Sequence, residues 1–483
     1  MQIGSRQMGG SSSKIPIYVD LDGTFIKSDM LFESFVAAVK KDFINLLRCI
    51  LWLMQGRACL KHQLACCTDI DISLIPLNSE FYRFLEKERD DGRRLVLATA
   101  AAEKYGQQFY KQYRHLFDSV LTGNGPHNLK GRAKLKMIRD ETDAFAYAGN
   151  SNIDFEIFRE AQESYLVNPE PGTRIRAKNI NGFTMFDLPA NRLRSWVKQL
   201  RLHQWLKNGL IFVPFLVSGA FLDGNRLGAS VVGFFAFSFL ASATYIINDL
   251  ADINSDRQHP RKKSRPLAAG SVGIPQALAA TAVLFGGAGV LASMIGGWYC
   301  ITLITYLGLT LCYSFCIKQY VVLDVIVLAS LYTIRILAGA VIIGKVVSFW
   351  LLSFSMFIFF SLALVKRCAE LKSLENRGMV ETNGRDYGVR DYPVLMAFGC
   401  SSSLMSILLF CFYTQNNVLT NQYQDPSLLW LIIPALGYWL TRMWIKTHRG
   451  EMHDDPIVFS LTDRGSLITI SVIIVLTLLA QIL

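Results

Sequence analysis

The chain changes its pattern of apolar residues near residue 205. Before that point apolar residues occur in short runs, and three of these runs, at 15–19, 94–97 and 145–148, predict buried strands separated by helices. After it, long apolar runs recur, and their length is typical of membrane-spanning helices. We expect nine spans, near residues 209–223, 228–247, 275–295, 298–316, 321–343, 349–365, 393–414, 427–444 and 466–483.

The composition agrees with a protein that lies largely in lipid. Hydrophobic residues make up 51% of the 483 residues and charged residues only 18%, fewer charges than a soluble protein usually carries. The net charge is +11, and most Lys and Arg between the spans fall in alternate loops, which is the pattern of cytoplasmic loops. We therefore expect a multi-pass protein of the cell inner membrane with a cytoplasmic N-terminal part, and no nucleic-acid partner. The cysteines and histidines show no metal-ligand or disulfide spacing.

Polar residues follow the three predicted strands. Asp20 and Asp22 follow the first, Thr99 ends the second, and Asn150 and Asp154 follow the third. Polar side chains at the carboxyl ends of successive strands mark the ligand crevice of an open α/β sheet. The motif Asp-x-Asp-Gly-Thr at 20–24 and the order of the later motifs resemble the haloacid dehalogenase-like phosphohydrolases.

That resemblance implies an α/β Rossmann-like phosphohydrolase domain over residues 15–188, with a helical cap at about 30–91 and a disordered N-terminus at 1–14. It implies that Asp20 is the nucleophile and Asp22 the general acid/base. Thr99 and Lys134, or alternatively Lys130, would bind the phosphoryl group. Mg²⁺ would be held by Asp20, Asp22, Asn150 and Asp154. The family usually has Asp in place of Asn150, which leaves open an active phosphatase or a relic or regulatory module.

Two further stretches stand out, an apolar one within this domain and an amphipathic one directly after it. Residues 43–54 are apolar but too short to span a membrane, so they form core or lie on the membrane surface. Residues 189–208 predict a basic amphipathic linker helix with Trp196 and Trp205, which suits the bilayer interface. An ordinary packed helix is the alternative for its first half.

The stretch 248–256 carries the most specific pattern of polar residues in the membrane part. Asp249, Asp252 and Asp256 have spacings of three and four, which places them on one face of a continuous helix. Carboxylates this close repel unless a cation neutralises them, and Mg²⁺ takes carboxylate and phosphate oxygens. We predict an Mg²⁺–diphosphate site here; the alternative is a solvated acidic helix end.

The same stretch, Asn-Asp-x-x-Asp-x-x-x-Asp, resembles the UbiA superfamily of intramembrane prenyltransferases, which implies an all-α membrane domain over 209–483. The second acidic cluster of that superfamily is absent, and Tyr313, Lys318 and Asp324 stand in its place. The pattern is similar to the decaprenyl-phosphate phosphoribosyltransferase-like branch. The residues that this resemblance and the excess of basic side chains assign to substrate binding are Lys207, Asn208, Asn248, Arg257, Lys263, Arg265, Tyr313, Lys318, Asp324, Arg335, Lys366, Arg367 and Arg449.

The favoured hypothesis is Mg²⁺-dependent displacement of diphosphate, with a 5-phosphoribosyl group passing from phosphoribosyl diphosphate to a polyprenyl phosphate lipid. The partners are then that lipid, a phosphorylated small-molecule donor and the bilayer. The alternative is an aromatic polyprenyltransferase, of 4-hydroxybenzoate type, with an unrelated phosphatase domain. A transporter or scaffold is disfavoured because, apart from Arg335, the spans contain few polar residues at mid-membrane depth. Arg335 is expected to pair with Asp324 or to contact substrate.

Overall fold

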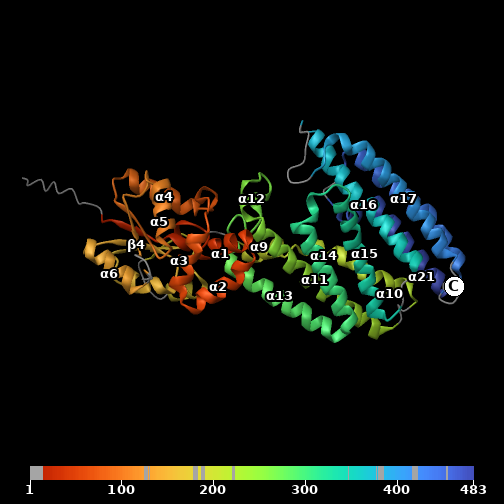
Figure 1. Cartoon of the computed structure of the whole chain (residues 1–483), viewed down its shortest axis with the longest axis horizontal. Helices are drawn as coiled ribbons and strands as arrows, with labels where there is room; N and C mark the ends of the chain where they lie inside the picture. Colours follow the sequence, from red (N-terminus) through yellow and green to blue (C-terminus); the bar gives the residue numbers. More distant parts are fainter. Residues whose placement is uncertain are drawn as a thin grey trace, which may run out of the picture. The chain divides into compact units, whose positions relative to one another are not determined.

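The structure is a computed structural model that describes residues 15–123, 129, 131–177, 183–186, 191–219, 223–345, 348–376, 378, 386–415, 423–452 and 455–483. The predicted disordered terminus 1–14 and Lys130 lie outside the described residues. The chain forms two compact units, coloured by sequence in Figure 1. The N-terminal unit comprises Met1–Gln199 and Asp249–Ala279, and the helical unit comprises Leu200–Asn248 and Ala280–Leu483.

The N-terminal unit is built on one six-stranded parallel sheet. Its order is β3-β2-β1-β4-β5-β6. The chain builds β1, β2 and β3 towards one edge, returns to place β4 on the other side of β1, and then builds β5 and β6 towards the opposite edge. The expectation of an α/β region with a parallel sheet is confirmed. The strands are β1 (Ile17–Val19), β2 (Leu95–Thr99), β3 (Ser119–Thr122), β4 (Ala146–Gly149), β5 (Glu163–Val167) and β6 (Phe183–Phe186).

Alternation along the central strands gives the sheet an apolar core on each face. Ile17 and Val19 of β1 pack into one core with Phe81 and Phe109, while Tyr18 points to the other with Ile138. Successive side chains of a strand point to opposite faces, and a sheet covered on both sides is apolar on both. The covering helices include α4 (Ser79–Asp90), α5 (Glu103–Gln112), α6 (Arg132–Glu141) and α7 (Phe155–Phe158).

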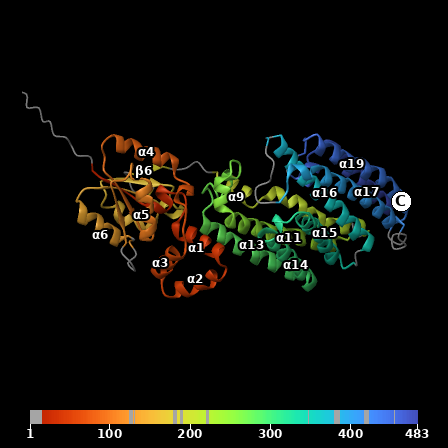
Figure 2. The same cartoon turned by 45° about the horizontal axis from the view of Figure 1, so that its top comes forward.

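Three helices are inserted between β1 and α4. They are α1 (Met30–Lys41), α2 (Ile44–Met54) and α3 (Arg57–Cys67), which pack together around Ala38, Cys49 and Leu64. Figure 2 shows them as one group at the edge of the N-terminal unit. The same unit also contains α8 (Pro171–Ala177), α9 (Arg192–Gln199), α12 (Ile253–Gln258) and η5 (Lys262–Ser264).

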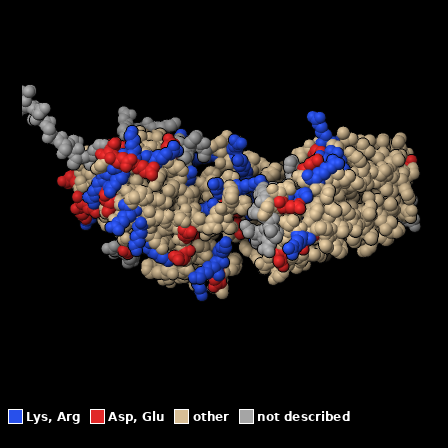
Figure 3. All heavy atoms as spheres, turned by 90° about the horizontal axis from the view of Figure 1, so that it is seen from above, with Lys and Arg blue, Asp and Glu red and all other residues tan. Residues whose placement is uncertain are grey.

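Eight helices among the described residues are long and apolar enough to cross a membrane. On the face drawn in Figure 3, most of the helical unit's surface carries no charged side chain. In chain order the helices are α11 (Gly224–Ala251), α13 (Ile274–Ile295), α14 (Gly297–Phe315), α15 (Leu323–Ile343), α16 (Phe349–Glu375), α17 (Tyr392–Thr414), α19 (Ile432–His448) and α21 (Arg464–Ile482). The spans of α17 and α19 include the short helical turns that precede them, η7 (Val389–Asp391) and η8 (Pro426–Leu431).

The region of the first predicted span is built differently from the other eight. It consists of η4 (Leu202–Phe212) followed by the short α10 (Val213–Val217), with Pro214 in its first turn. The carbonyl of Ile211 lies so close to Gly339 of α15 that a Cβ there would meet it at 2.1 Å. A tertiary contact between backbones therefore fixes an irregular segment where apolar length alone predicted a span.

The predicted linker helix at 189–208 is also interrupted. Helix α9 ends at Gln199, and Arg201 adopts a left-handed backbone with φ of 52° before η4 begins. Trp196 of α9 belongs to the N-terminal unit, whereas Trp205 of η4 donates from Nε1 to Ser242 Oγ over 2.9 Å in the helical unit. The single amphipathic helix predicted across this stretch is thus wrong, because the chain turns at Arg201.

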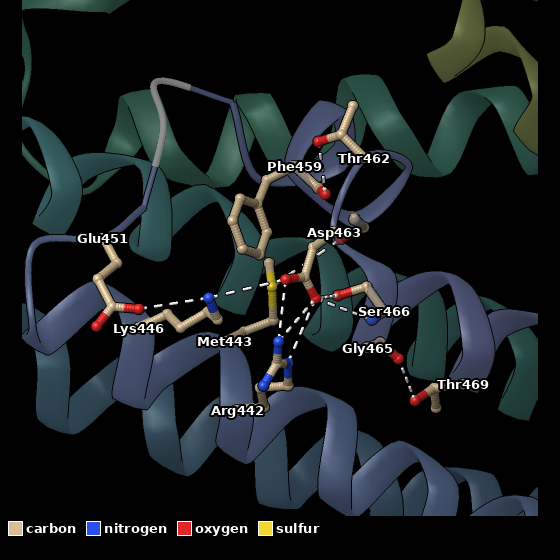
Figure 4. Close-up of polar contacts among 11 residues, drawn as sticks. Arg442, Met443, Lys446, Glu451, Phe459, Thr462, Asp463, Gly465, Ser466 and Thr469 are labelled. Carbon is tan, nitrogen blue, oxygen red and sulfur yellow. Dashed lines mark hydrogen bonds and ion pairs between the residues drawn. The ribbon is translucent and has the colours of Figure 1, made fainter.

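Charged side chains join α19 to the start of α21, as Figure 4 shows. Asp463 caps α21 by accepting from Ser466 N at 2.9 Å, and it also accepts from Arg442 Nη2 at 3.0 Å. Lys446 lies 3.7 Å from Asp463 and 3.3 Å from Glu451. This network fixes the register of two membrane helices at their polar ends.

Candidate functional site

A cavity of about 1120 Å³ lies at the carboxyl ends of the central strands in the N-terminal unit. Asp20 follows β1, Asn150 and Asp154 follow β4, and Asn168 follows β5; all line it together with Lys134 of α6. The carboxyl ends of parallel strands on either side of a reversal in strand order form a natural crevice. The predicted side chains Asp20, Asp22, Lys134, Asn150 and Asp154 are therefore brought to one cavity.

A chain of buried polar contacts links the acids of this cavity. Lys134 Nζ lies 2.8 Å from Asp20 Oδ1 and donates to the Tyr147 hydroxyl over 3.1 Å. Tyr147 in turn donates to Asp154 Oδ1 over 3.0 Å. Asp154 Oδ2 accepts from the backbone N and the hydroxyl of Ser151. One lysine thus faces two carboxylates, Asp20 and Asp154.

The charge balance shifts the pKa values of these groups. Burial raises the pKa of Asp20 above its usual range, although Lys134 acts in the opposite direction. Burial and the neighbouring Asp29 raise the pKa of Asp22 to about 8. Burial alone would lower the pKa of Lys134, but Asp20 and Asp154 raise it. Among the described residues, the lining of the cavity holds as many basic as acidic side chains, five of each. The raised pKa of Asp22 therefore reflects its burial and its nearest neighbours, and it favours a proton on Asp22 or a cation bound beside it.

Two local features shape the turn after β1. Gly23 has φ of 73°, and a Cβ there would lie 2.1 Å from Asn150 Nδ2. Asp22 Oδ1 accepts from Met30 N at 2.9 Å, which ties the turn to the start of α1. Thr99, which was predicted to bind the phosphoryl group, is fully buried, and its Oγ1 accepts a hydrogen bond from Ala101 N. The next residue, Ala100, lines the cavity in its place.

The acidic segment after α11 belongs to the same unit but has a different shape from the one predicted. Helix α11 ends at Ala251 and α12 begins at Ile253. The prediction of one helical face for the three aspartates is therefore wrong, because Asp252 lies at the break. Asp249 and Asp256 still converge: Arg265 Nη1 lies 3.1 Å from Asp249 Oδ1 and 2.7 Å from Asp256 Oδ2.

Neighbouring side chains complete this segment. Asp249 Oδ2 accepts from Gln199 Nε2 of α9 at 3.0 Å. Burial raises the pKa of Asp256 above its usual range, with Arg265 opposing the shift. Arg257, predicted to bind substrate, is instead buried against Glu33 of α1, with Nη2 and Oε1 2.5 Å apart. Lys263 is exposed.

A buried polar cluster lies near the start of η4 in the helical unit. Lys207 forms an ion pair with Asp455 and lies 5.7 Å from the ring centre of Tyr332. Burial would raise the pKa of Asp455, but Lys207 and Lys366 hold it below its usual range. Two lysines thus act on one carboxylate, and the three groups carry one positive charge in excess while both lysines are protonated.

Arg335, predicted to be buried within α15, does not pair with Asp324. It donates from Nε to Asn208 Oδ1 over 2.9 Å, and Asn208 Nδ2 donates to Ser238 Oγ over 2.9 Å. The guanidinium carbon lies 5.1 to 5.4 Å from the ring centres of Phe237, Tyr306 and Tyr332. The charge is therefore stabilised by an amide and by aromatic faces.

Asp324 is paired with Arg367 of α16 instead. Arg367 Nε lies 2.7 Å from Asp324 Oδ2, and the Tyr387 hydroxyl donates to Asp324 Oδ1 over 2.6 Å. Arg367 also donates to Glu370 and to the Tyr313 hydroxyl. Three of the predicted binding residues, Tyr313, Asp324 and Arg367, therefore share one network. Lys318 and Asn248 are half-buried, and Arg449 is exposed.

Residues 211–465 match the family model described as the UbiA prenyltransferase family. The chain belongs to the UbiA prenyltransferase family. It is therefore a multi-pass membrane protein of a family of transferases, as the sequence predicted.

One relative of this UbiA protein covers nearly its whole length, and two others cover 57% of it. The uncharacterized protein y4nM of Sinorhizobium fredii is 36% identical over 94% of this chain and 88% of its own. The nodulation protein NoeC of Azorhizobium caulinodans is 33% identical over 57% of this chain and 90% of its own. Decaprenyl-phosphate phosphoribosyltransferase of Mycolicibacterium smegmatis is 35% identical over 57% of this chain and 89% of its own.

The chemistry of the donors suits a divalent cation in two places of this UbiA protein. Within the described part of the chain, no three His, Cys, Asp or Glu side chains are grouped closely enough to hold a metal ion. Two buried carboxylates, Asp249 and Asp256, do point to one cation, the guanidinium of Arg265. Asp20 and Asp154 face Lys134 at the cavity, which Asp22 also lines. Both sets offer the hard oxygen ligands that Mg²⁺ takes.

Several cavity residues had no recognisable signal in the sequence. Tyr147 lies within a strand and looks like core, yet its hydroxyl bridges Lys134 and Asp154. Lys61 of α3 and Arg192 of α9 line the cavity from distant segments. Residues 270–271 and 273–276, which follow the acidic segment, line it as well. Only the fold brings such segments together, so spacing along the chain could not reveal them.

Proposed function

We propose that this UbiA protein transfers a 5-phosphoribosyl group from phosphoribosyl diphosphate to a polyprenyl phosphate, at the cytoplasmic side of the inner membrane. The observation that carries the proposal is the positively charged cluster of Lys207, Lys366 and Asp455. A donor with a diphosphate and a 5-phosphate, together with a lipid phosphate acceptor, presents more negative charge than a single prenyl diphosphate. The relatives named decaprenyl-phosphate phosphoribosyltransferase support the same choice.

Asp249 and Asp256, with Asp252 beside them, are the residues that would hold Mg²⁺. When bound, the ion would stabilise negative charge on a departing diphosphate. Lys207 and Lys366 would bind phosphate oxygens as point charges, and Arg335 would position Asn208 through its hydrogen bond. Arg265 would leave its carboxylates when the cation and donor bind.

The test uses the full chain in lipid nanodiscs. Labelled phosphoribosyl diphosphate is supplied with polyprenyl phosphate, and polyprenyl diphosphate is supplied with 4-hydroxybenzoate in parallel. We expect labelled lipid in the first assay and its loss in Asp249→Asn. Prenylated 4-hydroxybenzoate with no labelled lipid would instead establish the aromatic prenyltransferase.

We further propose that the N-terminal unit is a haloacid dehalogenase-like phosphatase acting on a phosphate monoester. Asp20 is oriented by Lys134 to attack phosphorus and form an aspartyl phosphate. Asp22, whose pKa is raised to about 8, is protonated near neutral pH and can protonate the leaving alcohol. It can then take a proton from the water that hydrolyses the aspartyl phosphate, which frees inorganic phosphate and restores Asp20. Asp20, Asn150 and Asp154 would hold Mg²⁺, which would neutralise charge on the phosphoryl oxygens while the Asp22 carboxyl keeps its proton.

The 5-phosphate of the transferase product is the substrate we propose for this phosphatase. The measurement is phosphate release from phosphoribosylated lipid by the parent chain and by Asp20→Asn. Unchanged release in the variant would exclude Asp20 chemistry, while the transferase assay above stays independent of that result.

A further inference from the structure

Helix α2 of the N-terminal unit turns its apolar side outward. Six side chains at helical spacing, each between 55% and 80% exposed, lie on one face: Phe43, Ile44, Leu47, Ile50, Leu51 and Met54. The residues that α2 buries are Asn45 and Cys49. Asn45 Nδ2 donates to the Ala38 carbonyl over 2.8 Å. The usual arrangement of a surface helix, with its polar side outward, is thus reversed.

The packing of α2 explains its inner side and leaves its outer side unexplained. Cys49 packs with Ala38 and Leu64, and Trp52 packs against the same cluster. That small core holds α2 against α1 and α3, and Figure 2 shows the three helices as one group. A contiguous apolar patch that is exposed on a folded unit marks an interaction site.

Basic residues border the apolar face. Lys40, Lys41, Arg48 and Arg57 are all exposed, and the only acidic residue among positions 40–61 is Asp42. A helix with an apolar face and flanking Lys and Arg binds in the plane of an anionic bilayer surface. The chain itself supplies the location, because it continues into eight helices that can cross a membrane. These two facts favour a lipid surface over a protein partner.

We propose that α2 is a membrane-docking helix, with Phe43, Leu47, Leu51 and Met54 inserted among the acyl chains of the bilayer surface and the flanking lysines and arginines at the lipid headgroups. Helices α1 and α3 hold α2, and Leu31 at the start of α1 and Lys61 of α3 line the cavity. Docking of α2 therefore brings the cavity to a phosphate carried by a lipid. This second step rests on the proposed phosphatase function, whereas the docking itself does not.

The docking is tested by photo-crosslinking in the full chain. The photoreactive amino acid p-benzoylphenylalanine replaces Leu51, or Ile175 of α8 as a matched control. Ile175 is 69% exposed and Leu51 59% exposed, so neither replacement disturbs a core. The purified chain is irradiated in nanodiscs of phosphatidylcholine that contain roughly 30% of the anionic lipid phosphatidylglycerol. The adducts are identified by mass spectrometry.

We expect lipid adducts at position 51 in at least about tenfold excess over position 175, since insertion places only the former among acyl chains. Equal lipid labelling at both positions would overturn the proposal. Adducts from position 51 to protein, within the chain or to a second copy, would also overturn it, because the face would then be covered by protein.

The consequence for the cavity is tested by the double variant Leu47→Glu/Leu51→Glu. We expect hydrolysis of a lipid-borne phosphate in nanodiscs to fall by about tenfold, with hydrolysis of water-soluble p-nitrophenyl phosphate unchanged. An equal fall for both substrates would point to misfolding and contradict delivery by α2. If the parent chain hydrolyses neither substrate, the phosphatase function fails while the crosslinking result still decides the docking.

Discussion

Lys134 is the one lysine of α6 that is buried, and its ammonium group lies between Asp20 and the Tyr147 hydroxyl. Through Tyr147 it also stabilises Asp154. A buried charge cluster of this kind is sensitive to loss of one partner, because the remaining charges lose their compensation in a low-dielectric site. Lys134 therefore both stabilises the folded N-terminal unit and supplies positive charge at the proposed phosphoryl site.

Lys134→Met should abolish most phosphate release, by about 10² to 10³-fold, because the charge that offsets the phosphoryl oxygens is removed. It should also destabilise the N-terminal unit by up to about 3–5 kcal/mol, since Asp20 and Asp154 lose the positive charge that compensates them. Lys136→Met on the same helix is the control, because Lys136 is exposed and its loss should change little. Phosphate release and thermal unfolding of the full chain give the two readouts. Parent-like release in Lys134→Met would contradict the proposed role.

Gly23→Ala should destabilise the N-terminal unit, because Gly23 has φ of 73° and its new Cβ would meet Asn150 at 2.1 Å. Gly92→Ala isolates the clash from the backbone strain, since φ is 81° there and no described atom lies within 4 Å of the Cβ position. Strain alone costs on the order of 1 kcal/mol. We expect a larger fall in unfolding temperature for Gly23→Ala than for Gly92→Ala, and partial recovery in Gly23→Ala/Asn150→Ala. Equal effects of the two single variants would show that the Asn150 side chain moves aside without a measurable loss of stability.

At the scale of elements, the lengths of the apolar runs predicted the parts of the fold that are regular. The three central strands and eight long apolar helices lie where short and long apolar runs placed them. The breaks at Arg201 and Asp252 and the irregular η4 were missed, because each depends on a contact with a distant segment. Ile211 against Gly339 is one such contact. Periodicity records which side of an element is apolar, and it does not record where a neighbour forces the chain to turn.

Asp463 caps α21, and its ionisation makes the stability of the protein depend on pH. Burial would raise its pKa, but hydrogen bonds from Arg442 and Ser466 lower the pKa to about 2. A carboxylate with a lowered pKa in the folded state stabilises that state above its unfolded pKa of about 3.9. The contribution is lost as the pH falls from about 4 through 2. Figure 4 shows the donors that cause this shift.

Asp463→Ala should lower the stability at pH 7 by about 1 kcal/mol, the usual value of an N-cap. Asp463→Asn keeps the hydrogen-bond acceptor, so it should stay close to the parent at pH 7 apart from the lost pairing with Arg442. Between about pH 4 and 2 the parent should lose stability relative to Asp463→Asn. The unfolding midpoint of the purified chain in one detergent, measured across this pH range, gives the comparison. A constant difference between parent and Asp463→Asn over that range would contradict the lowered pKa.

At the scale of the whole molecule, the acidic segment of the transferase is grouped with the N-terminal unit, and Arg257 forms one of the ties. The sequence placed Arg257 among phosphate-binding residues, since a basic residue after an acidic motif has that appearance. Its partner, Glu33, is 224 positions away, and no spacing rule connects them. Residue types and local order thus pointed to carboxylates and lysines that lie at the two candidate sites, and their roles stay predictions. They could not show which charges are already paired within the protein.

The pair Glu33–Arg257 gives a test of how firmly the acidic segment is held. Both side chains are at most 4% exposed, so removing one leaves the other buried without its counter-charge. Glu33→Gln and Arg257→Met should each destabilise the N-terminal unit by about 3–5 kcal/mol, whereas Glu33→Leu/Arg257→Met, which removes both charges, should cost clearly less than the sum. Hydrogen exchange of residues 249–279 should rise in the single variants and less in the double variant. Because Asp249 and Asp256 lie in that segment, labelled-lipid formation should follow the same order. Additive effects of the two single changes would mean that the pair contributes no coupling, and that the segment is held by its other contacts, such as Gln199 with Asp249.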